Sequence, residues 1–126
     1  MNKSKNAVFL GDSQENLRGF PEDVKDHIGF SLHRVQQGLK PLGDTKILKG
    51  IKPAAVEIIA SHNKNTYRAV YTIKIGAVVY VLHCFQKKSK FGIKTPKPDI
   101  DLIKKRLQDA IELEESNGEQ NEKYKN

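Results

Sequence analysis

Apolar side chains recur with two different periods along this chain, and each period predicts a kind of element. From Pro21 to Pro41 they return every three or four positions, which is typical of an amphipathic helix that lies on a sheet. Pro21 suits the first helical position, and Gly38 and Pro41 suit the helix end. The apolar stripe of this predicted helix consists of Val24, Ile28, Leu32, Val35 and Leu39.

Residues 56–85 show the alternation of β-strands instead. Three runs rich in β-branched and aromatic residues are separated by short turns, the second of which contains Gly76. This order predicts an antiparallel meander. The last run is apolar almost without interruption, so we expect a central strand covered on both faces. The three runs are 56–62, 67–73 and 77–85.

Weaker signals lie outside these stretches. Residues 7–10 predict a short first strand, and a brief helical turn is expected around Leu17. Residues 43–53 indicate an irregular connection with one small strand. Thr95 and Pro96 are typical of the start of a final helix. The apolar stripe of that helix consists of Ile100, Ile103, Leu107, Ala110 and Ile111.

The length of 126 residues suits one domain with one modest core. We expect a flexible N-terminal arm at 1–6, the domain at 7–115 and a polar disordered tail at 116–126. The N-terminus lacks the apolar stretch of a signal peptide, and no apolar run approaches the roughly 18 residues of a membrane span. We therefore expect a cytoplasmic protein that does not contact a membrane.

The charge is unevenly distributed. The formal net charge is +7, and residues 112–126 hold five acidic residues against two lysines. Residues 1–111 therefore hold 20 basic and 10 acidic residues, a net charge of +10. A body this basic is expected to meet an anionic partner, most commonly nucleic acid and next an acidic protein. The alternative is that the charge only keeps the protein in solution.

Candidate chemistry is concentrated after the last strand. Residues 86–97 contain five lysines and no acidic residue, interleaved with Phe91 and Ile93. A phosphate-binding glycine loop, a metal-spaced Cys/His cluster and a serine nucleophile motif are all missing from the sequence. Cys84 lies within an apolar run, where a small buried thiol is expected. We expect neither a metal ion nor another cofactor.

Two sequence motifs carry a family resemblance. The motif YRAVY is followed, after a short turn, by VYVLHCFQKKSKF, a threonine, a proline and a closing helix. From about residue 7 to residue 113 this order resembles the RelE/HigB-like toxins of bacterial type II toxin-antitoxin pairs, in the phage-related branch of the RelE/ParE superfamily. The resemblance implies an α+β fold, in which N-terminal helices and a C-terminal helix pack on a small curved antiparallel sheet.

The resemblance also implies a function and partners. Many such toxins are ribosome-dependent, metal-independent mRNA endonucleases that inhibit translation, so the ribosome and mRNA are expected partners. An antitoxin, expected to be a small helix-turn-helix protein, holds them inactive. One rival is a non-enzymatic protein that resembles ParE and blocks DNA gyrase. A third possibility is an RNA-binding module without catalysis.

The resemblance assigns candidate site residues. Arg68, Lys87 and Lys88 are expected in a cationic groove that holds the scissile phosphate. Relatives often have arginine two positions after the acid that corresponds to Glu57; this chain has Ile59 there, and His62 is a candidate replacement. The expected RNA-binding residues are Lys90, Lys94, Phe85 and Phe91.

The proton-transfer roles and the role of Arg68 stay open at this point. RNA cleaves when its 2′-hydroxyl attacks the adjacent phosphate, which requires alignment, charge stabilisation and two proton transfers. Arginine suits the first two tasks, and a lysine crowded by other cations suits the role of base because its pKa is lowered. The residue that acts as general base is left open. The alternative for Arg68 is a purely structural pair with Glu57 on the adjacent strand.

Overall fold

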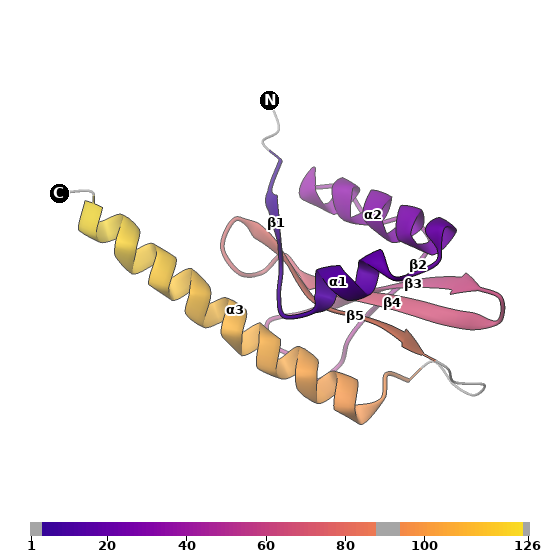
Figure 1. The fold of residues 1–126 in the computed structure, drawn as a ribbon. Helices are drawn as coiled ribbons and strands as arrows, with labels where there is room; N and C mark the ends of the chain where they lie inside the picture. The colour runs from indigo at the N-terminus through magenta and orange to yellow at the C-terminus, as the bar shows by residue number, and fades with distance from the viewer. Residues whose placement is uncertain (1–3, 88–93, 125–126) are drawn as a thin grey trace.

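Five strands form one sheet in the order β1-β5-β4-β3-β2 (Figure 1). The computed structural model of the chain describes residues 4–87 and 94–124, with side chains described as far as residue 117. The strands are β1 (Asn6–Phe9), β2 (Asp44–Ile47), β3 (Val56–His62), β4 (Asn65–Thr72) and β5 (Val78–Lys87). The helices are α1 (Ser13–Arg18), α2 (Glu22–Gln36) and α3 (Lys97–Tyr124).

The strand pairing confirms the predicted meander. Strands β2, β3, β4 and β5 pair antiparallel in succession. Strand β1 pairs parallel with β5, from Asn6 opposite Val78 to Phe9 opposite Val81. The sheet is therefore not wholly antiparallel, and β5 is an interior strand beside the middle strand β4. Local patterning cannot reveal this pairing, because it joins residues about 70 positions apart.

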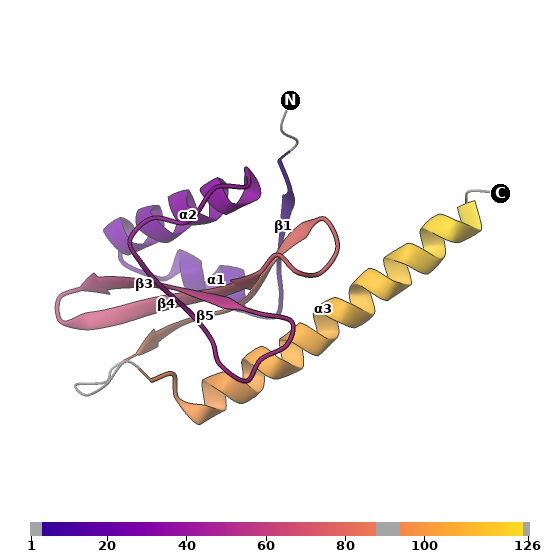
Figure 2. The same ribbon diagram turned by 180° about the vertical axis from the view of Figure 1, so that it is seen from behind.

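Helices cover both faces of the sheet (Figures 1 and 2). Helices α1 and α2 lie on one face and α3 lies on the other, which confirms the expected α+β architecture. The first four residues of the predicted α2 stripe are buried. The prediction that Leu39 is the fifth residue of this stripe is wrong. Helix α2 ends at Gln36, and Leu39 lies beyond Gly38, which has a positive φ, and is 49% exposed.

A β-bulge in β5 places the consecutive side chains of Leu82 and His83 on the same face of the sheet. Val70 of β4 lies opposite His83, whereas Tyr71 lies opposite Val81, so Leu82 is the extra residue. Leu82 is buried in the cluster formed with α3, and His83 also contacts α3. Side-chain alternation after the bulge then brings Phe85 to the α3 face. Lys87, two residues later, follows on that face.

Helix α3 is the longest element and extends beyond the body of the molecule (Figure 1). It continues to Tyr124, into the range for which the sequence predicts a disordered tail; the domain limits themselves stay a prediction. Tyr80 of β5 donates a hydrogen bond to Glu114 of α3, 2.7 Å away. Within the described part of the chain, no helix has the length and apolar character needed to cross a membrane.

Candidate functional site

Glu57 is the centre of a cluster of charged residues on the α3 face of the sheet. Its side chain is fully buried on β3. Arg68 of β4 donates from Nη1 to Glu57 Oε1 over 2.6 Å, and Thr95 donates from Oγ1 to Oε2 over 3.0 Å. Lys46 of β2, directly opposite Glu57 in the sheet, places Nζ 3.6 Å from Oε1. Four segments of the chain therefore meet at one carboxylate.

Arg68 is 2% exposed. It lies on the middle strand, where neighbours on both sides hold the backbone. Arg68 forms a short ion pair with Glu57, which is the contact expected if the role of Arg68 is purely structural. A charge-assisted hydrogen bond of this length fixes the guanidinium and orients it.

Lys87 lies at the end of β5 and is 6% exposed. Its Nζ donates a hydrogen bond to the backbone carbonyl of Lys94. Burial lowers the pKa of Lys87, and the positive charges of Arg68 and Lys46 lower it further, while Glu57 partly opposes them. An amine with a lowered pKa can accept a proton nearer neutral pH than an ordinary lysine, so Lys87 suits the role of a base.

The structure separates His62 from this cluster. His62 donates from Nδ1 to Asp23 Oδ2 over 2.8 Å, and Asp23 belongs to α2, which covers the opposite face. The hydrogen bond from His62 lowers the pKa of the Asp23 carboxyl. His62 is thus not brought near Arg68 or Lys87, and it does not occupy the position of a replacement cation beside them.

The predicted RNA-binding residues have different surroundings. Lys94 is exposed beside the cluster. Phe85 is buried and stacks on His83, with ring centroids 4.6 Å apart, so its ring is occupied within the fold. Lys88, Lys90 and Phe91 lie outside the described residues. Cys84 is buried as expected, and burial raises the pKa of its thiol to about 12.

Sequence reasoning missed Lys46 and Thr95 as members of the cluster. The sequence predicts an irregular connection over residues 43–53, and a local pattern does not show the register that places Lys46 opposite Glu57. Thr95 and Pro96 precede the final helix as predicted, but the sequence gives no sign that the Thr95 hydroxyl binds Glu57. The lysines at positions 46, 49 and 52 are spaced by three residues, which is not the two-residue period of a strand, so they give no signal for this register.

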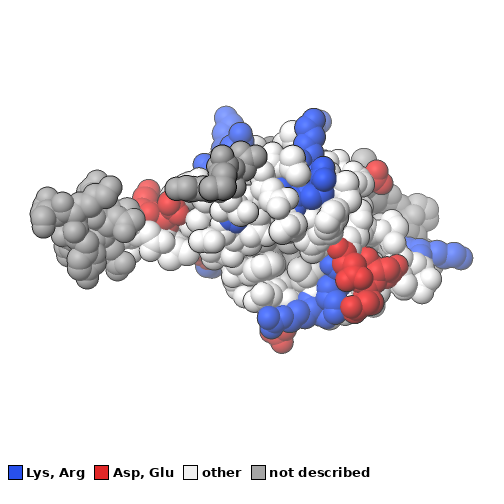
Figure 3. Space-filling model, turned by 90° about the horizontal axis from the view of Figure 1, so that it is seen from above, with Lys and Arg blue, Asp and Glu red and all other residues white. Residues whose placement is uncertain are grey.

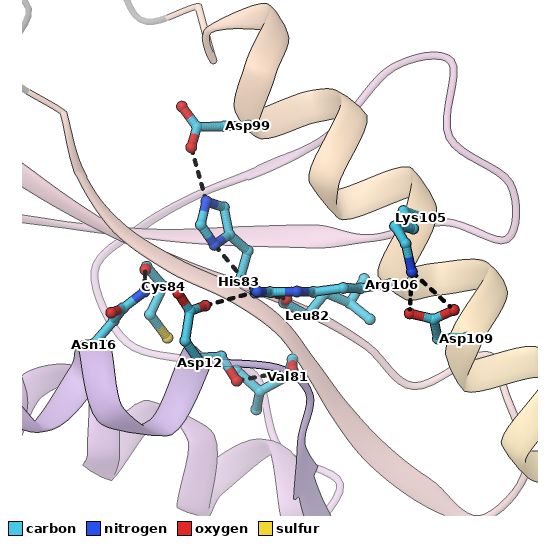
Figure 4. A network of polar contacts seen from close by, with 11 residues as sticks. Asp12, Asn16, Val81, Leu82, His83, Cys84, Asp99, Lys105, Arg106 and Asp109 are labelled. Carbon is cyan, nitrogen blue, oxygen red and sulfur yellow. Dashed lines mark hydrogen bonds and ion pairs between the residues drawn. The ribbon is translucent and has the colours of Figure 1, made fainter.

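A second network fixes α3, and with it the segment that holds Thr95 (Figure 4). Arg106 of α3 donates to the Leu82 carbonyl over 3.0 Å and to Asp12 Oδ1 over 2.7 Å. It also donates to His83 Nδ1 over 3.4 Å, while His83 Nε2 donates to Asp99 over 2.8 Å. The network joins β5 and the loop before α1 to the first three turns of α3.

Gly11 leaves room for the Arg106 guanidinium. A Cβ atom at residue 11 would lie 2.5 Å from Arg106 Nη2, and the Gly11 φ of +55° also disfavours other residues. A side chain at residue 11 would therefore displace the Arg106 guanidinium from its present position.

The side of the molecule formed by α1 and α2 differs in its charge pattern from the face that holds the Glu57 cluster. Viewed from the side of α1 and α2, basic and acidic side chains both fall in separate groups, and one acidic group is larger than the others (Figure 3). Glu22 and Asp23 lie in the first turn of α2. Among the described residues, no group of three or more His, Cys, Asp or Glu side chains could hold a metal ion.

The fold and the Glu57 cluster together indicate the class of protein to which the chain belongs. A five-stranded α+β domain with two N-terminal helices on one face and a C-terminal helix on the other has the architecture of a RelE-like fold. Residues 15–108 match the model of a family described as phage derived protein Gp49-like (DUF891). The chain belongs to this family, a RelE-like toxin family of the toxin-antitoxin superfamily. No curated protein matches the chain.

The family is associated with toxins of toxin-antitoxin pairs and implies a partner antitoxin. The matched region includes the residues that form the cluster around Glu57.

Proposed function

We propose that the protein is the toxin of a type II toxin-antitoxin pair and acts as a HigB-like, ribosome-dependent mRNA endonuclease. A small helix-turn-helix antitoxin would hold it inactive in the cytoplasm. The family membership supports the toxin role. The observation that carries the enzymatic role is Lys87, whose pKa is lowered by burial and by Arg68 and Lys46, at the end of an interior strand.

The cluster supplies groups that RNA cleavage requires. Neutral Lys87 would accept the proton of the 2′-hydroxyl as that oxygen attacks the adjacent phosphate. The bond from phosphorus to the 5′-oxygen then breaks, which leaves a 2′,3′-cyclic phosphate, and the departing 5′-oxygen takes a proton from water. Arg68 and Lys46 would stabilise the negative charge that builds on the phosphate oxygens, and Lys88 is proposed to assist them. Lys94, Lys90 and Phe91 are proposed to hold the flanking RNA. This reaction requires no metal ion in principle.

Access to the cluster depends on what covers it. Arg68 and Lys87 are both buried, so RNA must displace some of their present contacts. The hydrogen bond from Lys87 to the Lys94 carbonyl is one such contact. Thr95 would continue to bind Glu57 while Arg68 and Lys46, which also contact Glu57, turn toward a phosphate.

Pulse labelling of cells that express the protein without its antitoxin tests this function. We expect incorporation of labelled amino acids to stop soon after induction, while DNA supercoiling persists. The Lys87→Met variant should accumulate without stopping translation. Continued protein synthesis with a loss of supercoiling would instead support a ParE-like inhibitor of DNA gyrase. Arrest by Lys87→Met as strong as that by the wild type would argue for binding without catalysis.

A further inference from the structure

A groove of about 380 Å³ opens between β2 and the start of α3, beside the Glu57 cluster. Its volume falls within the range of roughly 300 to 1,000 Å³ that is usual for small-ligand sites. Two segments about 45 residues apart in the sequence form its walls. The groove is lined by Lys46, Ile47, Leu48, Lys49, Lys94, Thr95 and Ile100.

The lining combines positive charge with apolar surface. Three lysines line the groove, and none of the described residues in the lining is acidic. Lys49 and Lys94 are exposed, and the side chain of Lys46 is 26% exposed while it also contacts Glu57. Ile47 is 69% exposed at the end of an edge strand, so its side chain is accessible to a molecule in the groove.

We propose that this groove binds a nucleotide of single-stranded RNA next to the phosphate that is cleaved. The inference rests on the proposed function and adds a binding subsite to it. Phosphates would contact Lys49 and Lys94, because cations bind the backbone of single-stranded RNA, and the apolar face of a base would be buried against Ile47.

Two observations favour RNA over an acidic protein segment. The groove shares Lys46 and Thr95 with the Glu57 cluster, so a chain that lies in the groove continues directly toward Arg68 and Lys87. The three lysines are distributed over both walls, which suits a backbone with a charge at every step. Strand β2 therefore belongs to the substrate-binding surface.

Binding of a fluorescein-labelled single-stranded RNA oligonucleotide, followed by anisotropy over a range of salt concentrations, tests the proposal. Lys49→Ala should weaken binding about fivefold at 0.1 M salt and lower the logarithmic salt slope by about 0.7, the share of one phosphate contact. Ile47→Ala should weaken binding about threefold and leave the slope unchanged, because it removes only apolar contact. Lys40→Ala, which removes an exposed lysine outside the groove, is the matched control and should change neither quantity.

The outcomes separate the groove from the proposed function. If the wild type cleaves mRNA but Lys49→Ala and Ile47→Ala bind RNA as tightly as the wild type, the proposal that the groove binds RNA is wrong. The proposed function is then unaffected. A second outcome is that the two variants lose RNA binding as expected, while the wild type binds RNA but does not stop translation. That outcome supports the groove as an RNA-binding site and contradicts the endonuclease function. If Lys49→Ala weakens only antitoxin binding, the groove is a protein-docking site and the proposal is wrong.

Discussion

Glu57 shows how one buried acid can organise several cations. A fully buried carboxylate is costly unless it is paired and hydrogen-bonded, and Arg68, Lys46 and Thr95 provide such partners. The same arrangement brings two positive charges close to Lys87, whose pKa they lower. Stability and chemistry are therefore coupled at these residues, and single substitutions will affect both.

The first prediction separates the two roles of Arg68. Arg68→Ala removes the partner 2.6 Å from Glu57 and leaves a buried charge poorly compensated, so the free energy of unfolding should fall by about 3–5 kcal/mol. Combining Arg68→Met with Glu57→Gln removes both charges and should recover much of that loss. Denaturant unfolding measures both effects.

Cleavage by the folded double variant then reports on chemistry separately from stability. If Arg68 stabilises the phosphate, the folded double variant should cleave about 10² to 10³ times more slowly than the wild type. Arg68→Lys should keep the charge and recover part of the rate, because lysine lacks the planar fork. A double variant that cleaves at the wild-type rate would assign Arg68 a structural role only.

The second prediction concerns the pH dependence of Lys87. Lys46→Met removes one of the charges that lower the pKa of Lys87, so that pKa should rise toward its usual value. A base acts in its neutral form, and the rising limb of the pH–rate profile should therefore move to higher pH. Single-turnover cleavage over a pH series measures the shift. An unchanged profile would show that Lys87 is not the titrating base.

At the scale of elements, Arg106 adds a polar attachment of α3 to the sheet beside the apolar packing of the helix. Arg106 satisfies the Leu82 carbonyl and binds Asp12 and His83, which belong to different parts of the chain. Because Thr95 and Lys94 directly precede α3, this attachment also places two groups of the candidate site.

The third prediction follows from this attachment. Arg106→Met should lower the free energy of unfolding by about 2 kcal/mol, because buried acceptors lose their donor. Asp12→Asn should destabilise less, since Asp12 is half-exposed. Arg106 lowers the pKa of Asp12 below 3.8, so the stability from this charge is present above pH 3.8 and is lost as the pH falls through the lowered pKa.

Urea unfolding over a pH series checks that sign. The difference between wild type and Asp12→Asn should be constant near neutral pH and disappear in acid, where the wild-type carboxyl is protonated too. A difference that grows on acidification would contradict the ion pair.

The elements could be predicted where neighbouring residues determine them. Strand β3 begins and ends where the apolar pattern predicted, and the apolar stripe located α2. The parallel pairing of β1 and the bulge at Leu82 depend on distant partners and have no local signal. For the same reason, the sequence indicated a pair between Glu57 and Arg68 as one alternative but did not reveal Lys46 beside them.

At the scale of the whole molecule, charge distinguishes the two faces and the two ends. The site face carries lysines along the groove, whereas two acidic residues lie in the first turn of α2 and five lie within residues 112–126. The lysines of the groove favour the approach of an anionic surface from that side.

The fourth prediction is that ribosome binding weakens steeply with salt. Each RNA phosphate that the protein neutralises contributes roughly 0.7 to 0.9 to the logarithmic slope, so a contact through several lysines should give a slope of a few units. Sedimentation with ribosomes at increasing salt concentration measures it. A nearly flat response would indicate an apolar protein interface and would favour a protein target such as gyrase.

Mapping of mRNA 5′ ends on programmed ribosomes tests the central claim most directly. Purified protein, free of antitoxin, is added to ribosomes stalled on a defined mRNA, with and without added chelator, and the ends are located by primer extension. We predict new ends only in the presence of ribosomes, unaffected by the chelator, and absent with Lys87→Met. Intact mRNA in the presence of folded wild-type protein that still binds the ribosome would contradict the endonuclease function.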